Sequence, residues 1–368
     1  MRGGGEVVNP KLSSSVSVVP LGDGIVEFFK TNTRQQVRLR TQDNTILQIA
    51  NGLDGSRTAR EIAEDYGCTL SSVESLLAHL SRHGILDNIS PREDLDSYGD
   101  FRRVVSFLQD FSTSHEHLVE MWGRIRCSRV LVIGLGAVGS WVACTLVQSG
   151  VRRLILMDPD KVELSNLHRQ LGYTTGDVGR PKVDALAEKL RRYREDLDIK
   201  GVQSELDGQS LEALGDQRID LVVDCADKPT VDQTSIWVGE YCMPRGIPHI
   251  VGGGYNLHLS LIGQTVIPGE TACVKCFERQ LERENEIDPT RVKKLQVPNR
   301  KVGSLGPLCA LNASMVSMEA VKVLSGCAAP ANVNRRGEFD ITTMDVSYTT
   351  VEKLDDCEWC GVHGKYSG

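Results

Sequence analysis

Two pairs of cysteines in this chain have the spacing of a metal-binding site. The first pair is Cys273-x-x-Cys276, and the second is Cys357-x-x-Cys360. Four thiolates arranged in two such pairs bind Zn²⁺ tetrahedrally and leave no open coordination position for chemistry. A single pair would be equally compatible with a thiol–disulfide redox centre, which stays the alternative. We therefore predict a structural zinc ion that ties the C-terminal tail to the core.

The sequence Gly134-x-Gly136-x-x-Gly139 has the pattern of a phosphate-binding loop. It follows an apolar run that predicts a strand, and it opens a helical pattern. Glycines at these positions permit a tight turn and let backbone amides approach a phosphate at the helix N-terminus. Asp158 ends the next predicted strand, where an acidic residue accepts hydrogen bonds from ribose hydroxyls. The pattern predicts a nucleotide-binding site. It is most frequent in dehydrogenases that use a dinucleotide, and a glycine-rich turn without a ligand is the simplest alternative.

Two cations and an acid beyond this loop favour a nucleoside triphosphate over a dinucleotide. Arg169 and Lys182 flank a turn next to the expected phosphate position, and such charges stabilise a phosphoryl or adenylyl group during transfer. Asp227 follows a third apolar run and could hold Mg²⁺, which binds through one or two carboxylates. Each residue alone could be an ordinary surface residue, but their order and spacing together predict chemistry on ATP.

The elements that must position these residues alternate between strands and helices. Apolar runs predict buried strands at 130–133, 153–158, 220–225 and 247–251, with helical patterns at 137–148 and 181–194. Such alternation is typical of βαβ units around a mostly parallel sheet. Residues 126–368 are therefore expected to form an α/β domain with a Rossmann-like, doubly wound sheet.

Residues 1–90 predict a separate, smaller domain. Strands are expected at 15–19, 25–30 and 36–41, followed by helices at 45–51, from Thr58 and from Ser71. The last two helices open with capping boxes, Thr58-x-x-Glu61 and Ser71-x-x-Glu74. Three strands and three short helices in so few residues predict a winged-helix-like α+β unit, and residues 91–125 a helical connector.

Composition excludes several classes of function. The chain has 368 residues, a net charge of −7 and 40% hydrophobic residues, which is typical of an ordinary globular protein. No uninterrupted apolar run is long enough for a membrane helix, and no basic stripe predicts nucleic-acid binding, even by the winged-helix-like unit. Eleven cysteines, an odd number, argue against a disulfide framework, so we expect a cytoplasmic protein that binds neither membrane nor nucleic acid.

Seven stretches of the chain carry a resemblance to a known family. They are VLVIGLGAVGS, LILMDPDKVELSNLHRQ, DVGRPKVDA, LVVDCADKP, TACVKC, LGPLCALNASMVSMEAVKVLSG and CEWC. In this order they resemble the adenylating enzymes of the ThiF/MoeB/E1 family. The resemblance implies an ATP-binding adenylation domain with a structural zinc ion.

The same resemblance implies a role for each candidate site residue. Asp158 would bind ribose, and Asp227 would bind Mg²⁺. The residues expected around the phosphates of ATP are Asn166, Arg169, Gln170 and Lys182, next to the loop glycines Gly134, Gly136 and Gly139. Members act as homodimers and send an arginine into the partner's site. Arg103, rather than Arg102, is the expected arginine; a solvated helix face is the alternative for this pair.

One departure from the family pattern concerns a nucleophile. Activators of ubiquitin-like proteins often carry a cysteine between the first C-x-x-C pair and the last long helix, and it receives the acyl group as a thioester. Residues 277–308 contain no cysteine, and Cys309 is expected to be a small buried residue. The stretch is charged instead, and either crosses over the substrate channel or is a solvated loop. We therefore do not expect a thioester step.

The second departure is the N-terminal unit. The stretch TILQIANGLDGSRTAREIAEDYGCTLSSVESLLAHLSRHGIL resembles the PqqD-type element that recognises leader peptides of ribosomally made precursors. Such elements bind the leader as an added strand, here in a predicted groove between 36–41 and the helix at 71–83. Both halves together resemble the stand-alone E1-like enzymes of microcin and pantocin biosynthesis.

This resemblance implies an ATP-dependent, peptide-modifying enzyme. It would adenylate a carboxylate of a precursor peptide bound at residues 15–90, and a peptide nucleophile would then capture the adenylate, as in glutamate–glutamate cyclisation. Two alternatives stay open. One is an E1-like activator that adenylates the Gly-Gly end of a sulfur-carrier protein, and the other is a nucleotide-sensing winged-helix regulator.

Overall fold

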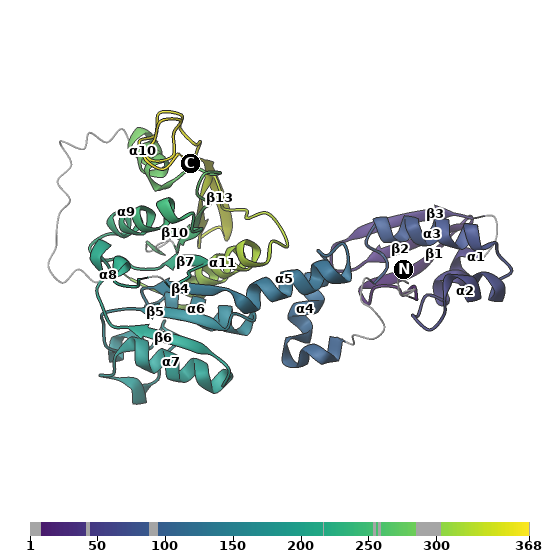
Figure 1. Ribbon diagram of the computed structural model, residues 1–368, viewed down its shortest axis with the longest axis horizontal. Helices are drawn as coiled ribbons and strands as arrows, with labels where there is room; N and C mark the ends of the chain where they lie inside the picture. Colours follow the sequence, from purple (N-terminus) through teal and green to yellow (C-terminus); the bar gives the residue numbers. More distant parts are fainter. Residues whose placement is uncertain are drawn as a thin grey trace, which may run out of the picture. The chain divides into compact units, whose positions relative to one another are not determined.

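The computed structural model divides into two compact units, Met1–Glu120 and Met121–Gly368. It describes residues 9–41, 45–87, 95–215, 217–252, 255–256, 259–284 and 303–367. Strands and helices of both units are labelled in Figure 1.

The N-terminal unit is an antiparallel sheet covered on one face by helices. Its strands β1 (Val16–Gly22), β2 (Ile25–Lys30) and β3 (Gln35–Arg40) pair in the order β1-β2-β3. The helices α1 (Thr45–Asn51), α2 (Ala59–Asp65) and α3 (Leu70–Arg82) follow along the chain. The apolar face of the sheet and these helices bury a common core that includes Phe28, Val37, Ile62, Val73 and Leu80. The expected small α+β unit is confirmed.

Helix caps in this unit agree with only one of the two predicted capping boxes. The hydroxyl of Thr58 accepts the Glu61 amide while the Glu61 side chain accepts the Thr58 amide, so α2 begins as predicted. The second box was wrong. α3 begins one residue earlier, at Leu70, because Thr69 is its N-cap and accepts the Ser72 amide at 3.2 Å.

A buried ion pair attaches the next helices to the N-terminal unit. η1 (Leu95–Phe101) and α4 (Arg102–Gln109) lead into α5 (His115–Cys127), which crosses the boundary between the units. The Lys30 ammonium, at the end of β2, lies 3.0 Å from the Asp110 carboxylate just after α4, and both side chains are largely shielded from solvent. This contact makes α4 part of the small unit's structure.

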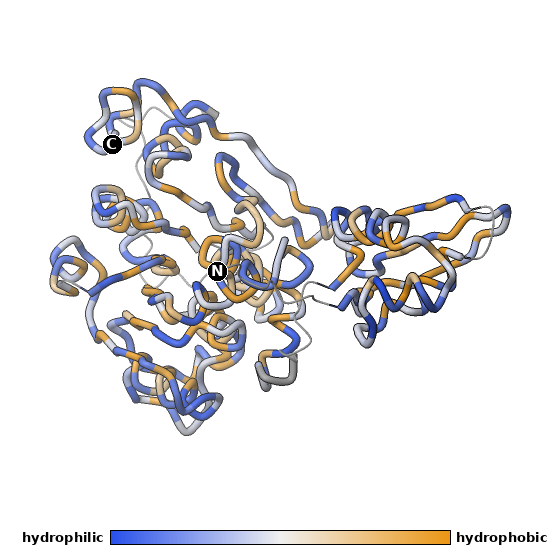
Figure 2. The backbone as a smooth tube through the Cα atoms, turned by 45° about the vertical axis from the view of Figure 1, so that its right-hand side comes forward, coloured by the Kyte–Doolittle hydropathy of each residue, from blue (hydrophilic) through white to orange (hydrophobic). Residues whose placement is uncertain are grey.

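The C-terminal unit is built on a six-stranded sheet with the order β11-β8-β7-β4-β5-β6. The strands are β4 (Arg129–Ile133), β5 (Arg153–Met157), β6 (Asp198–Val202), β7 (Leu221–Asp224), β8 (His249–Val251) and β11 (Gln264–Val266). All neighbours pair in parallel except β11, which is antiparallel to β8. Figure 2 shows that the central strands are strongly hydrophobic, as expected for strands buried on both faces.

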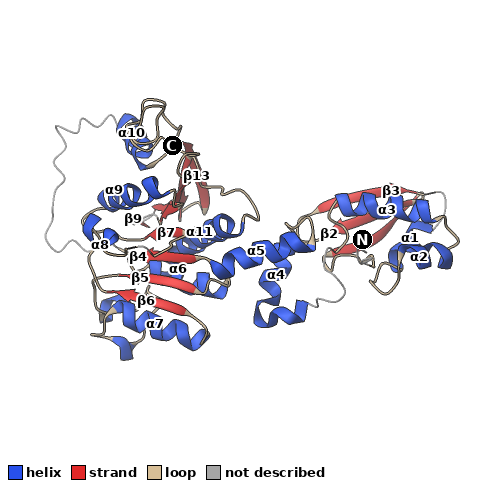
Figure 3. Ribbon diagram, in the orientation of Figure 1, coloured by secondary structure: helices blue, strands red, loops and turns tan. Residues whose placement is uncertain are grey.

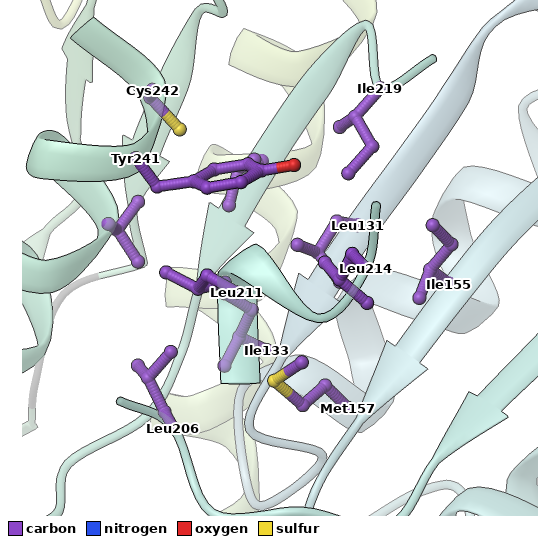
Figure 4. Close-up of a cluster of buried hydrophobic side chains, with 12 residues drawn as sticks. Leu131, Ile133, Ile155, Met157, Leu206, Leu211, Leu214, Ile219, Tyr241 and Cys242 are labelled. Atoms are coloured by element: carbon purple, nitrogen blue, oxygen red, sulfur yellow. The ribbon is translucent and has the colours of Figure 1, made fainter. Parts of the chain in front are cut away.

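Helices cover both faces of this sheet. α6 (Gly139–Gln148) packs against α7 (Lys182–Tyr193) and against α11 (Gly306–Ser325), whereas α8 (Gly208–Glu212) packs against α9 (Val231–Cys242). Figure 4 shows the core between the sheet and α9, where Tyr241 and Cys242 face strand residues such as Leu131 and Ile155. The predicted doubly wound α/β fold is confirmed. Its strand order reverses between β4 and β7, the position where such sheets bind ligands.

Elements that sequence patterns did not predict lie mainly near the C-terminus. β6 alternates charged and apolar residues, and a second sheet has the order β13-β12-β10-β9. Its strands are β9 (Tyr255–Asn256), β10 (Leu259–Ile262), β12 (Arg335–Asp340) and β13 (Asp345–Thr350). Figure 3 draws β13 in red close to α10 (Val274–Glu284). α11 has the length and hydropathy of a membrane span, but more than half of that window is buried inside the fold.

Candidate functional site

The glycine-rich loop joins the carboxyl end of β4 to α6. A Cβ atom on Gly139 would lie 1.9 Å from the Gly134 carbonyl oxygen, and one on Gly134 would lie 2.7 Å from the Ala226 amide nitrogen, after β7. Gly134 also has a φ of +78°, a backbone conformation that residues other than glycine rarely adopt. At Gly136 the nearest described neighbour of such an atom is the side-chain nitrogen of Gln170, 3.8 Å away. Packing therefore explains two of the glycines, and only Gly136 leaves its surface open.

Asp158 follows β5 and anchors the loop from behind. Its carboxylate accepts the Leu135 amide at 2.6 Å and the Asp160 amide at 2.8 Å. Burial raises the pKa of Asp158, and the nearby Lys182 ammonium, 3.6 Å away, opposes that rise. The predicted ribose-binding acid is thus held rigidly beside the loop.

Lys182 begins α7 and is almost completely buried. Its ammonium donates to the Asp160 carboxylate at 3.0 Å. Asp160 also lies 3.5 Å from the Lys228 ammonium, in the loop after β7. The two lysines offset the burial of Asp160 and lower its pKa. The ends of β5 and β7 and the start of α7 are therefore joined by charges around one carboxylate.

Three polar residues of the segment after β5 lie at the same edge. Asn166 is buried and accepts the Glu163 amide at 3.0 Å, so its side-chain oxygen holds its own turn. Gln170 is buried next to Gly136, and its side-chain oxygen has no hydrogen-bond partner among the described residues. Arg169 donates to the Ser165 carbonyl at 2.9 Å, while no described residue forms a hydrogen bond with its buried Nε. Unpartnered buried polar atoms are rare in folded proteins, so these two side chains are poised for a polar ligand.

The remaining predicted residues are placed less directly. Asp227 is exposed in the loop that carries Lys228, at the edge of the site. Burial, together with the nearby Asp227 charge, raises the pKa of the Asp224 carboxyl. Arg103 is exposed in the first turn of α4, in the N-terminal unit. Cys309 is fully buried, as predicted. Residues 285–302, most of the predicted crossover loop, lie outside the described residues.

The four predicted metal ligands form one buried cluster. Their Sγ atoms all lie within 4.8 Å of one another, with 3.5 Å between Cys273 and Cys357 and 3.4 Å between Cys276 and Cys360. A tetrahedral zinc ion with Zn–S bonds of about 2.3 Å separates its sulfurs by about 3.8 Å. The donor set and its spacing therefore fit a closed Zn²⁺ site.

Packing around this cluster explains how the tail reaches it. The first pair lies at the start of α10, and the second lies in turns after the last strand. Arg279 of α10 forms an ion pair with Asp356 at 2.9 Å, next to the second pair. The buried Trp359 ring fills the space above Gly239 of α9, where a Cβ atom would lie 2.6 Å from it. The cluster thus joins α9, α10 and the tail.

Comparison with known proteins decides the family. The model of the ThiF family matches residues 115–360, more than half of the chain. The chain belongs to the ThiF family. The sulfur carrier protein ThiS adenylyltransferase of Escherichia coli (strain K12) is 32% identical over 235 residues, which cover 64% of this chain and 86% of that protein.

Solved structures resemble the chain beyond the ThiF domain. Escherichia coli MccB with ATP has a TM-score of 0.75 at 18% identity and covers 96% of this chain and 99% of its own. The microcin C7 biosynthetic enzyme MccB in complex with N-formylated MccA gives a TM-score of 0.74. PaaA has a TM-score of 0.72 at 21% identity and covers 92% of this chain and 99% of its own. At such identities the likeness concerns the fold alone.

Sequence reasoning missed two acids of this candidate site. Asp160 forms ion pairs with both Lys182 and Lys228. The sequence Asp158-x-Asp160 directly after a predicted strand could have pointed to this second acid. Asp224 ends β7 and is fully buried, and burial raises its pKa to about 7. An acid closing an apolar run could have pointed to it, but burial at the centre of a sheet is a tertiary property.

Proposed function

We propose that this protein is an ATP-dependent enzyme that adenylates a carboxylate of a ribosomally made precursor peptide. The ThiF-family match supports adenylation, and the site supports it chemically. A carboxylate oxygen of the peptide attacks the α-phosphorus of ATP, the bond to pyrophosphate breaks, and an acyl adenylate forms. The side chains of Arg169 and Gln170, each with a buried polar atom that has no partner among the described residues, and the buried Lys182 lie where they would bind the phosphates and offset charge in transfer.

Other residues take supporting roles in this proposal. Gly136 leaves room for the phosphates to approach the backbone, and Asp158 would accept hydrogen bonds from ribose. Asp227 would hold Mg²⁺, which neutralises phosphate charge. Asn166 fixes the turn that presents Arg169. The cysteine cluster would hold structural Zn²⁺, which stabilises the fold and takes no part in the reaction.

The observation that carries the peptide role is the extent of the fold likeness. The family model begins at residue 115, whereas MccB covers 96% of the chain, including a counterpart of the small N-terminal unit. MccB is described in complex with the peptide MccA. We therefore propose that a leader peptide docks on residues 15–90 and delivers its core to the adenylation site.

The later steps of the proposal concern capture and assembly. A nucleophile of the same peptide attacks the carbonyl carbon of the acyl adenylate, AMP leaves, and the new bond closes a ring. Two glutamates would be joined in this way in a pantocin-like product. The enzyme would act in the cytoplasm as a homodimer in which Arg103 reaches the partner's nucleotide.

Pyrophosphate exchange tests the proposal. The protein is incubated with ATP, Mg²⁺, labelled pyrophosphate and candidate precursor peptides, and label in ATP and peptide mass are followed. We expect exchange with a leader-bearing peptide, and we expect Arg169→Ala to reduce it at least about a hundredfold, since a charged group at a transferring phosphate contributes about 3 kcal/mol or more. Unchanged exchange in this variant would contradict the site assignment.

Sulfur-carrier activation is the second candidate, because the ThiS adenylyltransferase is 32% identical to this chain. It predicts exchange with a carrier protein ending in Gly-Gly. Exchange with such a carrier, and with none of the peptides, would replace the peptide proposal by this one.

A further inference from the structure

Asn312 of α11 carries two buried polar atoms that no described residue satisfies. Its side chain is completely shielded from solvent. Neither its Oδ1 nor its Nδ2 forms a hydrogen bond with any residue that the structure describes. A buried polar group without a partner costs free energy, and such groups are rare in native folds. This side chain therefore offers both an acceptor and a donor to a ligand.

The packing of α11 places Asn312 at the edge of the sheet that carries the candidate nucleotide site. In the first turn of the helix, a Cβ atom on Gly306 would lie 3.8 Å from the Cα atom of Arg169. One turn after Asn312, the Val316 side chain would lie 3.0 Å from a Cβ atom on Gly263, which itself lies against the last carbonyl of β8. Asn312 lies between these contacts, about 9 Å along the helix axis from Gly306.

The charge of Arg169 acts on the same face of α11. Burial raises the pKa of the Cys309 thiol, one turn before Asn312, and the Ser304 hydroxyl and the Arg169 guanidinium oppose that rise. Residues three apart are neighbours on a helix surface, so Cys309 and Asn312 share this face. The unpartnered carboxamide therefore lies near the arginine assigned to the phosphates.

A second unpartnered polar group lies on the strand that packs against α11. Ser260 of β10 is completely buried, and no described residue forms a hydrogen bond with its hydroxyl. It lies opposite Phe339 of β12, so both side chains point to the same face of that sheet. Phe339 packs in one cluster with Leu308, four residues before Asn312 on α11. Ser260 and Asn312 therefore border the same cluster from two sides.

We propose that Asn312 and Ser260 bind a peptide group of the substrate, next to the carboxylate that is adenylated. This inference rests on the proposed adenylation and names the substrate class as a carboxylate with a neighbouring amide. Asn312 Oδ1 can only accept, so it needs an N–H group, which a carboxylate lacks. The Asn312 Nδ2 and the Ser260 hydroxyl donate to carbonyl oxygen. A carboxylate without a neighbouring N–H leaves Oδ1 unpartnered and binds more weakly.

Two carboxylates of the same shape test this inference on the full chain. The probes are N-acetylglycine and 4-oxopentanoate, in which a methylene group replaces the N–H. Ligand-observed NMR titrations with Mg²⁺ and a non-hydrolysable ATP analogue measure their affinities. We expect N-acetylglycine to bind about tenfold tighter, because one hydrogen bond to a buried acceptor distinguishes them. Equal affinities, or no binding of either probe, would overturn the proposal.

Variants assign the preference to its residues. Asn312→Ala should bring the ratio of the two affinities close to one, because the acceptor for the N–H is gone. Ser260→Ala should weaken both probes alike and keep their ratio, because both carry the carbonyl group. A preference for N-acetylglycine that survives in Asn312→Ala would refute the assignment.

A matched variant separates ligand binding from a structural role. Asn332 is also buried, but its side-chain oxygen accepts from Arg335 at 3.3 Å. Asn332→Ala should lower Tm by about 3–9 °C, whereas Asn312→Ala should change it by less than about 3 °C, since no internal hydrogen bond is lost. An equal loss in both variants would show that Asn312 is bound within the fold, by water or by the chain, and would overturn the proposal. Pyrophosphate exchange reports adenylation separately: a preference for N-acetylglycine without any exchange would retain the amide site and reject that function.

Discussion

Alanine at Gly136 and at Gly139 should separate ligand binding from folding within one loop. A Cβ atom at Gly139 would lie 1.9 Å from the Gly134 carbonyl oxygen, so the backbone must move by more than 1 Å. Such overpacking costs about 1–3 kcal/mol. At about 3 °C per kcal/mol for a unit of this size, Gly139→Ala should lower Tm by about 3–9 °C without any ligand.

Gly136→Ala should instead leave the ligand-free stability nearly unchanged and weaken nucleotide binding. Among the described residues the added atom meets only the Gln170 side chain, at 3.8 Å, and φ at Gly136 is not positive. The ligand-free stability should therefore change by less than about 0.5 kcal/mol. The methyl group instead occupies the surface that a phosphate would approach. A clash of about 2 kcal/mol corresponds to about a thirtyfold loss of affinity for MgATP.

Differential scanning fluorimetry with and without MgATP measures both effects. At a nucleotide concentration of 100 times the wild-type Kd, binding stabilises the wild type by about 2.7 kcal/mol, and a thirtyfold weaker variant by about 0.9 kcal/mol. The nucleotide-induced shift in Tm should therefore fall to about one third in Gly136→Ala. If Gly136→Ala instead lowers the ligand-free Tm as Gly139→Ala does, or keeps the full shift, the assignment of Gly136 to the nucleotide surface is wrong.

Two further predictions concern metal and pH. The purified chain should contain one zinc ion by elemental analysis. Cys276→Ser should lose this ion, and its free energy of unfolding should fall by more than about 4 kcal/mol, while substitution of the exposed Cys127 by serine should change neither quantity. A zinc-free chain of full stability would exclude the site. Burial raises the pKa of Asp224 to about 7 in the folded protein, compared with about 3.9 in the unfolded chain. Between these two pH values the folded state binds a proton that the unfolded state has lost, so the free energy of unfolding should fall by up to about 4 kcal/mol as pH rises from about 4 to about 7. Urea unfolding across that range should show a smaller fall for Asp224→Asn, and parallel curves for the two proteins would contradict the raised pKa.

Local patterns predicted the larger elements well. The strands β4, β5, β7 and β8 are short apolar runs, and such runs are buried on both faces of a parallel sheet. The capping box at Thr58 was correct because both of its hydrogen bonds lie within four residues. The box at Ser71 was wrong because Thr69 offered a competing cap two residues earlier. β6 and the second sheet escaped prediction because their strands pair with strands that are distant in sequence, which no local pattern reveals.

The sequence by itself determined which residues could hold a metal and which loop could approach a phosphate. Cysteine spacing and glycine positions are local constraints, since few other residues permit the same ligand set or turn. The tertiary structure alone decided that Gly134 and Gly139 are required by contacts, that Asp160 joins Lys182 to Lys228, and that Asp224 is buried. These properties depend on which strands lie side by side, and the order of strands in a sheet is set by packing across the whole domain rather than by any short segment of the chain.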